Sequence, residues 1–353
     1  ERVRVMPEFV SVDVDGGVAT INLVRPPTNA LYIQMQQEIA EASRELGARA
    51  DVRAVILYGG PKLFAAGALS AFALLSTTAH AALEVFACHP EWASLAQELA
   101  GKRASVFSAT TAMQDVHRIQ ARPSLIARAR MADLVICTGA DLEVGWMPMV
   151  RTQAGNPKIR AGQPGNLEIA NHVPRIETPV SVDRALGDMH PMGNPHVQWS
   201  PRAVALAADE VTKRLVQIDP AGRADYEARL ADFRTRWTAA TARWTQLAAP
   251  LKGVPVIQHH REHSYLLDFL GMPIIGSLEP KPGIEPTSGQ LSALLVQQQR
   301  QPARLVLRTA YQQEGPSQWI AGKTGMPAVL LPYTVGGTPE AKDLFGLFDD
   351  TIQ

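Results

Sequence analysis

Residues 122–139, RPSLIARARMADLVICTG, place a short helix directly before an apolar strand. Because proline favours the first turn of a helix, we expect the helix to cover residues 123–130. The run 133–137 is apolar after its first residue and is followed by Gly139, which indicates a buried strand. A helix that leads into a buried strand is typical of an α/β fold with a parallel sheet.

The same alternation continues on both sides of this stretch. We expect strands at 83–88, 104–108, 254–258, 273–276, 303–308 and 328–332, and helices at 92–99, 265–270, 288–299 and 316–325. Ligands of such sheets bind outside the carboxyl ends of the strands. The sequence from residue 83 onward therefore predicts an α/β fold whose functional residues follow its strands.

Residues 199–249 are almost purely helical, and Pro220 divides them into two helices. In the second helix, apolar residues recur at spacings of three and four, namely Tyr226, Leu230, Phe233, Trp237, Ala240, Trp244 and Leu247. At 1.5 Å per residue, about 28 residues span roughly 40 Å. We predict that this helix joins two α/β lobes, which cover 83–199 and 251–353, with 200–250 as the helical connector.

The first 68 residues follow a different pattern. Residues 10–14 and 18–23 alternate apolar and polar side chains around an Asp-Gly-Gly turn, which predicts a β-hairpin. An amphipathic helix is expected at 29–47 and a short strand at 54–58. This ββαβ segment forms a separate N-terminal region in our interpretation, and we expect it to pack loosely against the rest.

The segment 69–82 resembles the apolar part of a secretory signal peptide, with Ala79-His80-Ala81 as a cleavage site. It is too short and too polar to span a bilayer, and a buried helix is the alternative. We therefore expect residues 83–353 to be periplasmic or secreted. Because signal peptides stand at N-termini, the internal position of this segment leaves the destination of the intact chain open.

Composition excludes some classes of partner. The chain has 353 residues with 34 basic and 34 acidic side chains, so a basic nucleic-acid-binding face is not expected. The two cysteines, Cys88 and Cys137, each lie in an apolar strand-like run. We expect two buried thiols, with a disulfide as the alternative, and no thiolate metal site from so few cysteines.

Three separate segments end in histidine: 114–117, 193–196 and 256–260. Neutral imidazole is a common zinc ligand, and three imidazoles make most of a tetrahedral site. We predict His117, His196 and His260 as metal ligands, with His259 as the competitor of its neighbour. Binding requires neutral rings, so we expect affinity to fall below about pH 6.

Residues 83–353 resemble the metal-binding family of solute-binding proteins that serve ABC transporters. The segments that carry the resemblance are 115–143, 187–196, 256–265, 278–283 and 331–337. The resemblance implies two lobes with metal between them, the three histidines as ligands, and delivery of the metal to an ABC permease without catalysis. Three imidazole ligands favour zinc over manganese, with copper and nickel as alternatives, and we expect a monomer.

The fourth metal ligand stays open in this interpretation. The family often supplies a carboxylate near the last strand, but residues 329–336 contain no acid. Water, Glu91, Asp115 or Glu262 are the alternatives. We expect His190 to be a solvated loop residue and His89 to have no ligand role.

Residues 8–68 resemble the start of the crotonase (enoyl-CoA hydratase) family, through 25–31, 54–60 and 64–68. The resemblance implies one oxyanion-hole donor, the backbone N–H of Ala66. It stops at Leu69, where the family has an aspartate, and no later part of the chain supplies the second donor or the glutamates. A truncated or fused crotonase-type hydratase or isomerase is therefore the alternative function.

A third interpretation is a zinc metalloprotease, because residues 259–263 fit the pattern H-x-x-E-H. That chemistry requires both histidines and the glutamate on one helix face. A strand is expected directly before His259, which disfavours the protease.

Overall fold

The structure is a computed structural model that describes residues 8–24, 33–59, 82–179 and 190–353. Its chain divides into two compact units, Glu1–His80 and Ala81–Gln353, which are described separately below. The crotonase-like motifs at 25–31 and 64–68 and nearly all of the signal-like segment lie outside the described residues. Within the described ranges, no helix is long and apolar enough to cross a membrane.

The small unit is a three-stranded sheet with one helix. Its elements are β1 (Val10–Asp15), β2 (Val18–Leu23), α1 (Ile33–Gly47) and β3 (Ala54–Tyr58). The strand order is β1-β2-β3, with β1 antiparallel and β3 parallel to β2. Gly16 and Gly17 have positive φ angles, which explains why the predicted hairpin turn contains two glycines. Met35, Ile39 and Leu46 of α1 are buried in a small apolar core with side chains of β1 and β2.

Lobe 1 of the large unit contains one parallel sheet. Its elements are β4 (Leu83–Ala87), α3 (Pro90–Ala100), β5 (Ala104–Ser108), α4 (Pro123–Met131), β6 (Leu134–Cys137), α5 (Met147–Ala154) and β7 (Asn166–Glu168). The strand order is β5-β4-β6-β7, and every pairing is parallel. The central strand β6 is buried along its whole length, as the apolar run in the sequence predicts.

Lobe 2 repeats this architecture. Its elements are β8 (Val256–Gln258), α8 (Ser264–Leu270), β9 (Ile274–Ser277), α9 (Ser288–Arg300), β10 (Leu305–Thr309), α10 (Glu314–Thr324), β11 (Ala328–Leu331) and α11 (Leu344–Ile352). The strand order is β11-β10-β8-β9, again with parallel pairings. The prediction of two α/β lobes with parallel sheets is therefore confirmed.

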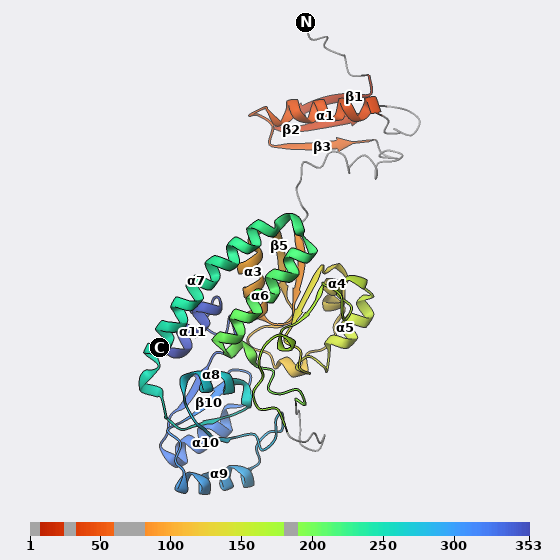
Figure 1. Cartoon of the computed structure of the whole chain (residues 1–353). Helices are drawn as coiled ribbons and strands as arrows, with labels where there is room; N and C mark the ends of the chain where they lie inside the picture. The colour runs from red at the N-terminus through yellow and green to blue at the C-terminus, as the bar shows by residue number, and fades with distance from the viewer. Residues whose placement is uncertain (1–7, 25–32, 60–81, 180–189) are drawn as a thin grey trace. The chain divides into compact units, whose positions relative to one another are not determined.

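Two helices connect the lobes. Helix α6 (Pro201–Ile218) begins at Ser200, whose hydroxyl accepts a hydrogen bond from the backbone of Ala203, and a turn at Pro220 separates it from α7 (Arg223–Leu247). Helix α7 has 25 residues, which corresponds to about 37 Å. It runs along one side of the large unit, past lobe 1 to lobe 2 (Figure 1).

The apolar stripe of α7 forms the middle of a core that both lobes share. Phe233, Trp237 and Trp244 are buried, and Trp244 stacks on Phe348 of α11 with ring centroids 4.7 Å apart. The same apolar cluster reaches the strands of lobe 1 and helix α8 of lobe 2. Leu247, expected on the stripe, is 48% exposed because it lies at the end of the helix.

The expectation of two buried thiols is wrong. Cys88 and Cys137 form a disulfide, with Cα atoms 4.8 Å apart. Cys88 directly follows β4, Cys137 ends β6, and these strands are parallel neighbours. The sequence shows that both residues lie at strand ends, but it does not show which strands are adjacent.

Candidate metal centre

His117 lies in a single 3-10 turn, Val116–Arg118, in the loop after β5. Asp115 begins this turn, and its Oδ1 accepts hydrogen bonds from the backbone N–H (3.0 Å) and ring Nδ1 (2.9 Å) of His117. Because a carboxylate can only accept, the proton of the neutral ring is on Nδ1. The lone pair of Nε2 is left for another partner, and among the described residues this buried nitrogen has none.

His190 and His196 lie on either side of a turn before α6. Gly193 has a φ of 99°, and an added Cβ would come within 3.0 Å of the carbonyl oxygen of Ile176. Asn194 fixes the turn: its Oδ1 accepts from the backbone N–H of His196 at 2.9 Å, and its carbonyl oxygen accepts from the Tyr265 hydroxyl at 2.6 Å. Through Tyr265 of α8, the segment from lobe 1 is attached to lobe 2.

His260 follows β8 at its carboxyl end, where ligands of parallel sheets bind. Its Nδ1 lies 2.8 Å from Oε2 of Glu279, which also accepts from the backbone N–H of Gly283 at 2.7 Å. The carboxylate therefore orients the ring in the same way as Asp115 orients that of His117.

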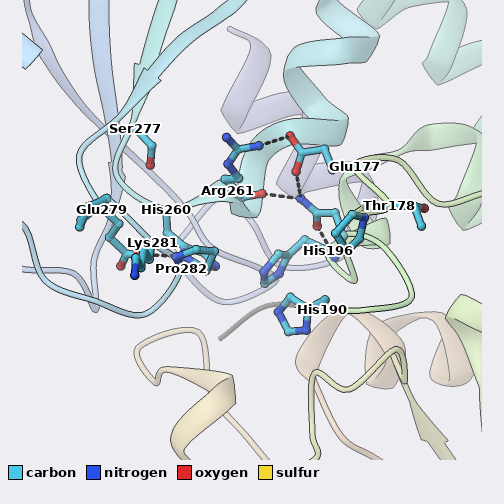
Figure 2. Close-up of a pocket in the computed structure, with 13 residues that line it drawn as sticks. Glu177, Thr178, His190, His196, His260, Arg261, Ser277, Glu279, Lys281 and Pro282 are labelled. Carbon is cyan, nitrogen blue, oxygen red and sulfur yellow. Dashed lines mark hydrogen bonds and ion pairs between the residues drawn. The ribbon is translucent and has the colours of Figure 1, made fainter. Parts of the chain in front are cut away.

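These segments bring four imidazoles together. The ring centroids of His117 lie 5.4 Å from His260, 5.5 Å from His190 and 5.6 Å from His196, and those of His196 and His260 are 5.5 Å apart. One ring nitrogen from each of His117, His190 and His196 lies within 4.8 Å of the other two. His190, His196 and His260 line a cleft of about 680 Å³, with Glu177, Arg261 and Glu279 at its wall (Figure 2).

The electrostatics of the cluster favour neutral rings at His190 and His196. Burial lowers the pKa of His190 to about 3, and the nearby rings of His117 and His260 act in the same direction. Burial holds the pKa of His196 well below its usual range. Burial also acts to lower the pKa of His260, but the hydrogen bond to Glu279 and nearby carboxylates outweigh it and leave this pKa raised.

The buried ring nitrogens test whether a metal fits this site. Both nitrogens of His190 and His196, and Nε2 of His117, have no hydrogen-bond partner within the described parts of the chain. An unsatisfied buried polar group costs about 1–3 kcal/mol. A neutral imidazole has one lone-pair nitrogen, so a cation bound by one nitrogen of each ring would remove that penalty at that nitrogen. The donor set therefore fits a divalent metal ion.

The structure thus brings the three predicted histidines together and adds a fourth. His190 was expected to be a solvated loop residue, but it is half-buried against His117. One signal in the sequence could have indicated it: His190 and His196 flank Gly193, and a glycine turn folds the two rings toward one centre.

The other candidates for ligands lie in different surroundings. His259 is fully buried, and its Nε2 is 3.9 Å from Glu285. His89 is bonded to Glu143 at 2.6 Å and to Thr110 at 3.2 Å. Among the acids considered, Asp115 orients His117, while two accept other hydrogen bonds: Glu262 from Gln312 and Glu91 from Thr334.

The geometry required by the H-x-x-E-H pattern is not present. His259 directly follows strand β8, and Arg261–His263 form a 3-10 turn instead of a longer helix. The two histidines and Glu262 therefore do not share one face of an α-helix. Among the described residues, His259, Glu262 and His263 do not form a group that could hold a metal ion.

Comparison with known families agrees with this geometry. Residues 85–353 match the family described as zinc-uptake complex component A, periplasmic. The chain belongs to this family. A crystal structure of ZnuA is 19% identical, with a TM-score of 0.62, and the match covers 77% of this chain and 97% of that chain.

Other solved members of this fold carry different metals. A zinc-bound ZnuA deletion mutant is 19% identical with a TM-score of 0.64, over 77% of this chain and 96% of that one. A manganese-bound mutant of a periplasmic metal-binding protein from Candidatus Liberibacter asiaticus is 15% identical with a TM-score of 0.62, over 76% and 96%. At these identities the likeness shows the shared two-lobe fold.

The N-terminal resemblance is also confirmed. Residues 13–112 match the enoyl-CoA hydratase/isomerase family. Probable enoyl-CoA hydratase EchA17 of Mycobacterium tuberculosis is 52% identical over 67 residues, which is 18% of this chain and 26% of the relative. The chain thus spans about a quarter of the length of these curated relatives.

Proposed function

We propose that residues 83–353 capture one divalent metal ion between the two lobes, with His117, His196 and His260 as ligands. The observation that carries this proposal is the convergence of four imidazole rings. Those of His117, His190 and His196 hold buried nitrogens with no other partner within the described residues, and the ring of His260 lies 5.4 Å from that of His117 and 5.5 Å from that of His196. His190 is the fourth ligand in this proposal, because its ring lies against His117. Asp115 serves to orient His117 instead of binding the metal.

Zinc is the preferred metal in this proposal. Four neutral imidazoles match the tetrahedral coordination that zinc adopts with nitrogen ligands. Manganese favours oxygen ligands, and the carboxylates of Asp115 and Glu279 are already bonded to ring nitrogens. These carboxylates also increase the basicity of the rings, which strengthens binding of zinc.

We further infer that the chain delivers its metal to an ABC permease as a periplasmic or secreted monomer and catalyses no reaction. Family membership supports this role, since the family is described as the periplasmic component of a zinc-uptake complex. The cleft supports it as well, because its wall is built from both lobes.

Calorimetric titration of the full-length chain with zinc tests the proposal. We expect one tight site in the natural sequence and none in the triple variant His117→Ala, His196→Ala, His260→Ala. His172→Ala is the matched control, because His172 is a partly exposed histidine that pairs with Glu210 and lies outside the cluster. Binding that survives the triple substitution would overturn the assignment.

The single variant His190→Ala tests the fourth ligand separately. We expect zinc to bind still, with affinity reduced roughly tenfold or more, because three imidazoles and water can complete the tetrahedron. An unchanged affinity would return the fourth position to water or a carboxylate.

A further inference from the structure

A second group of metal-ligating side chains lies in lobe 1 and uses none of the four histidines. Cys88, Cys137 and Glu143 each offer an atom, and the three atoms lie within 4.8 Å of one another. The side chains are at the carboxyl ends of β4 and β6, and each residue is less than 5% exposed. Two cysteines are too few for a metal site when the sequence is considered alone, but the fold adds a carboxylate to them.

The carboxylate is fixed by three hydrogen bonds. Glu143 Oε1 accepts from the backbone N–H of Thr138 at 2.8 Å and lies 2.6 Å from Nε2 of His89, and Oε2 accepts from the backbone N–H of Gly139 at 2.9 Å. A carboxylate oxygen can accept two hydrogen bonds, so Oε2 retains a lone pair. His89 fixes the orientation of this carboxylate, as hydrogen-bond partners do for metal-ligating carboxylates in other proteins.

The strands hold the Cα atoms of the two cysteines close together. The Cα atoms of Cys88 and Cys137 are 4.8 Å apart because they extend two neighbouring strands. In a tetrahedral site with Zn–S bonds of about 2.3 Å, two sulfurs lie roughly 3.8 Å apart. Side-chain rotation alone can reach this separation once the covalent bond between the sulfurs is absent.

We propose that reduction of the Cys88–Cys137 disulfide creates a second, thiolate-type metal site with Glu143 as its third ligand. Reduction adds two electrons and two protons to the S–S bond and yields two thiols, and a dithiol reductant is converted to its own disulfide. A divalent cation then replaces the two thiol protons, which are released to solvent. Thiolates select zinc or cadmium over manganese.

The proposal makes the number of bound metal ions depend on the redox state. The oxidised chain holds a metal only at the histidine cluster, whereas the reduced chain holds a second ion in lobe 1. Since the chain contains only two cysteines, any thiolate–metal bond in a single chain must come from this pair.

Cobalt(II) is a suitable probe, because thiolate ligands give it a charge-transfer absorption band that imidazole does not. The full-length chain is prepared under a phosphine reductant, which becomes phosphine oxide as water supplies the oxygen, and is compared with chain whose disulfide is verified by mass. We expect two equivalents of cobalt and the sulfur band in the reduced chain, against one equivalent without the band in the oxidised chain. A reduced chain without the band would overturn the proposal.

Three variants separate this site from the histidine cluster. The double change Cys88→Ser, Cys137→Ser should bind one equivalent without the band in either preparation. The double change His117→Ala, His196→Ala should keep the band in the reduced chain, so failure of the first site does not hide the second. Glu143→Gln should weaken the band-forming site roughly tenfold or more while the histidine site is retained. A band that persists in the serine variant would contradict the assignment.

Discussion

The two units of this chain differ in how much of their relatives' length they cover. The small unit matches its relatives at 52% identity but spans 26% of their length, whereas the large unit matches ZnuA at 19% identity and spans 97% of it. In the small unit, strand β3 presents Val55, Ile56 and Tyr58 at 46–50% exposure. In the large unit, an apolar core reaches both lobes. Sequence identity is therefore higher in the small unit, which covers a small part of its relatives, and lower in the large unit, which spans nearly all of ZnuA.

The difference has a physical origin. A metal site requires a few side chains held by a closed core, and the large unit supplies both. Acyl-CoA chemistry requires two oxyanion donors and an acid or base from segments far apart in the sequence. A unit of the size of Glu1–His80 buries a smaller share of its surface than a larger domain and is therefore less stable.

The largest expected effect is on catalysis. The full-length chain should hydrate a short enoyl-CoA thioester no faster than buffer does, while a complete enzyme accelerates its reaction about 10⁶-fold or more. Loss of the enoyl absorbance over time measures this rate. Turnover that disappears when residues 1–68 are deleted would contradict this prediction, because it would show that the small unit is catalytically active.

Metal should stabilise only one unit. At zinc concentrations about 1,000 times Kd, the large unit should gain about 4.1 kcal/mol in its free energy of unfolding, because only its folded form binds. All six tryptophans lie at residue 92 or later, so tryptophan fluorescence during urea unfolding reports the large unit alone. A midpoint that zinc does not move, or one moved equally by magnesium, would contradict specific binding there.

A matched pair of core substitutions should separate the units further. Met35→Ala in α1 and Leu95→Ala in α3 each remove a fully buried side chain, at a cost of about 2–5 kcal/mol. This is comparable to the whole stability of the small unit but not of the large one. Hydrogen exchange should show lost protection in β1–β3 for the first variant and retained protection in β4–β6 for the second. Retained protection in both would show that the small unit is more stable than its core implies.

The smallest expected effect is the pH dependence of zinc affinity. Burial lowers the pKa of His190 to about 3 and holds the pKa of His196 well below its usual range, so these rings add little proton competition. The pKa of His260 is raised, so this ring gains its proton first as pH falls, and zinc must displace it. Affinity should decrease about tenfold per pH unit below that pKa, or about 1.4 kcal/mol. Titrations between pH 7.5 and 5 check the slope, and an unchanged affinity would argue against the histidine site.

Much of the fold could be predicted because it depends on local patterns. The apolar run at β6, the glycine turn at Gly16 and the stripe of α7 are each visible in a short window. Short elements were missed, because few residues carry too little of a periodic pattern: β7 has 3 residues, α5 has 8 and α11 has 9. Their positions depend on packing against elements distant in sequence.

The site was predictable only in part for the same reason. His117, His196 and His260 end recognisable segments, but the position of His190 depends on how the turn at Gly193 packs against Ile176. The pairing of Cys88 with Cys137 depends on the adjacency of β4 and β6, which is a property of sheet order. The disulfide pairing is not contained in local sequence, and the only local signal for His190 is the glycine turn at Gly193.

The packing of α11 against α7 bears on how long a captured ion stays bound. The last helix of the chain stacks Phe348 on Trp244 and also meets Trp199, next to the turn that carries His196. The lobes are thus attached at a second place besides α7, and wide separation would break a continuous apolar core. In the proposed function, an ion would therefore leave through small movements of side chains and loops at the cleft. Unloading would then require the proposed membrane partner to deform these loops.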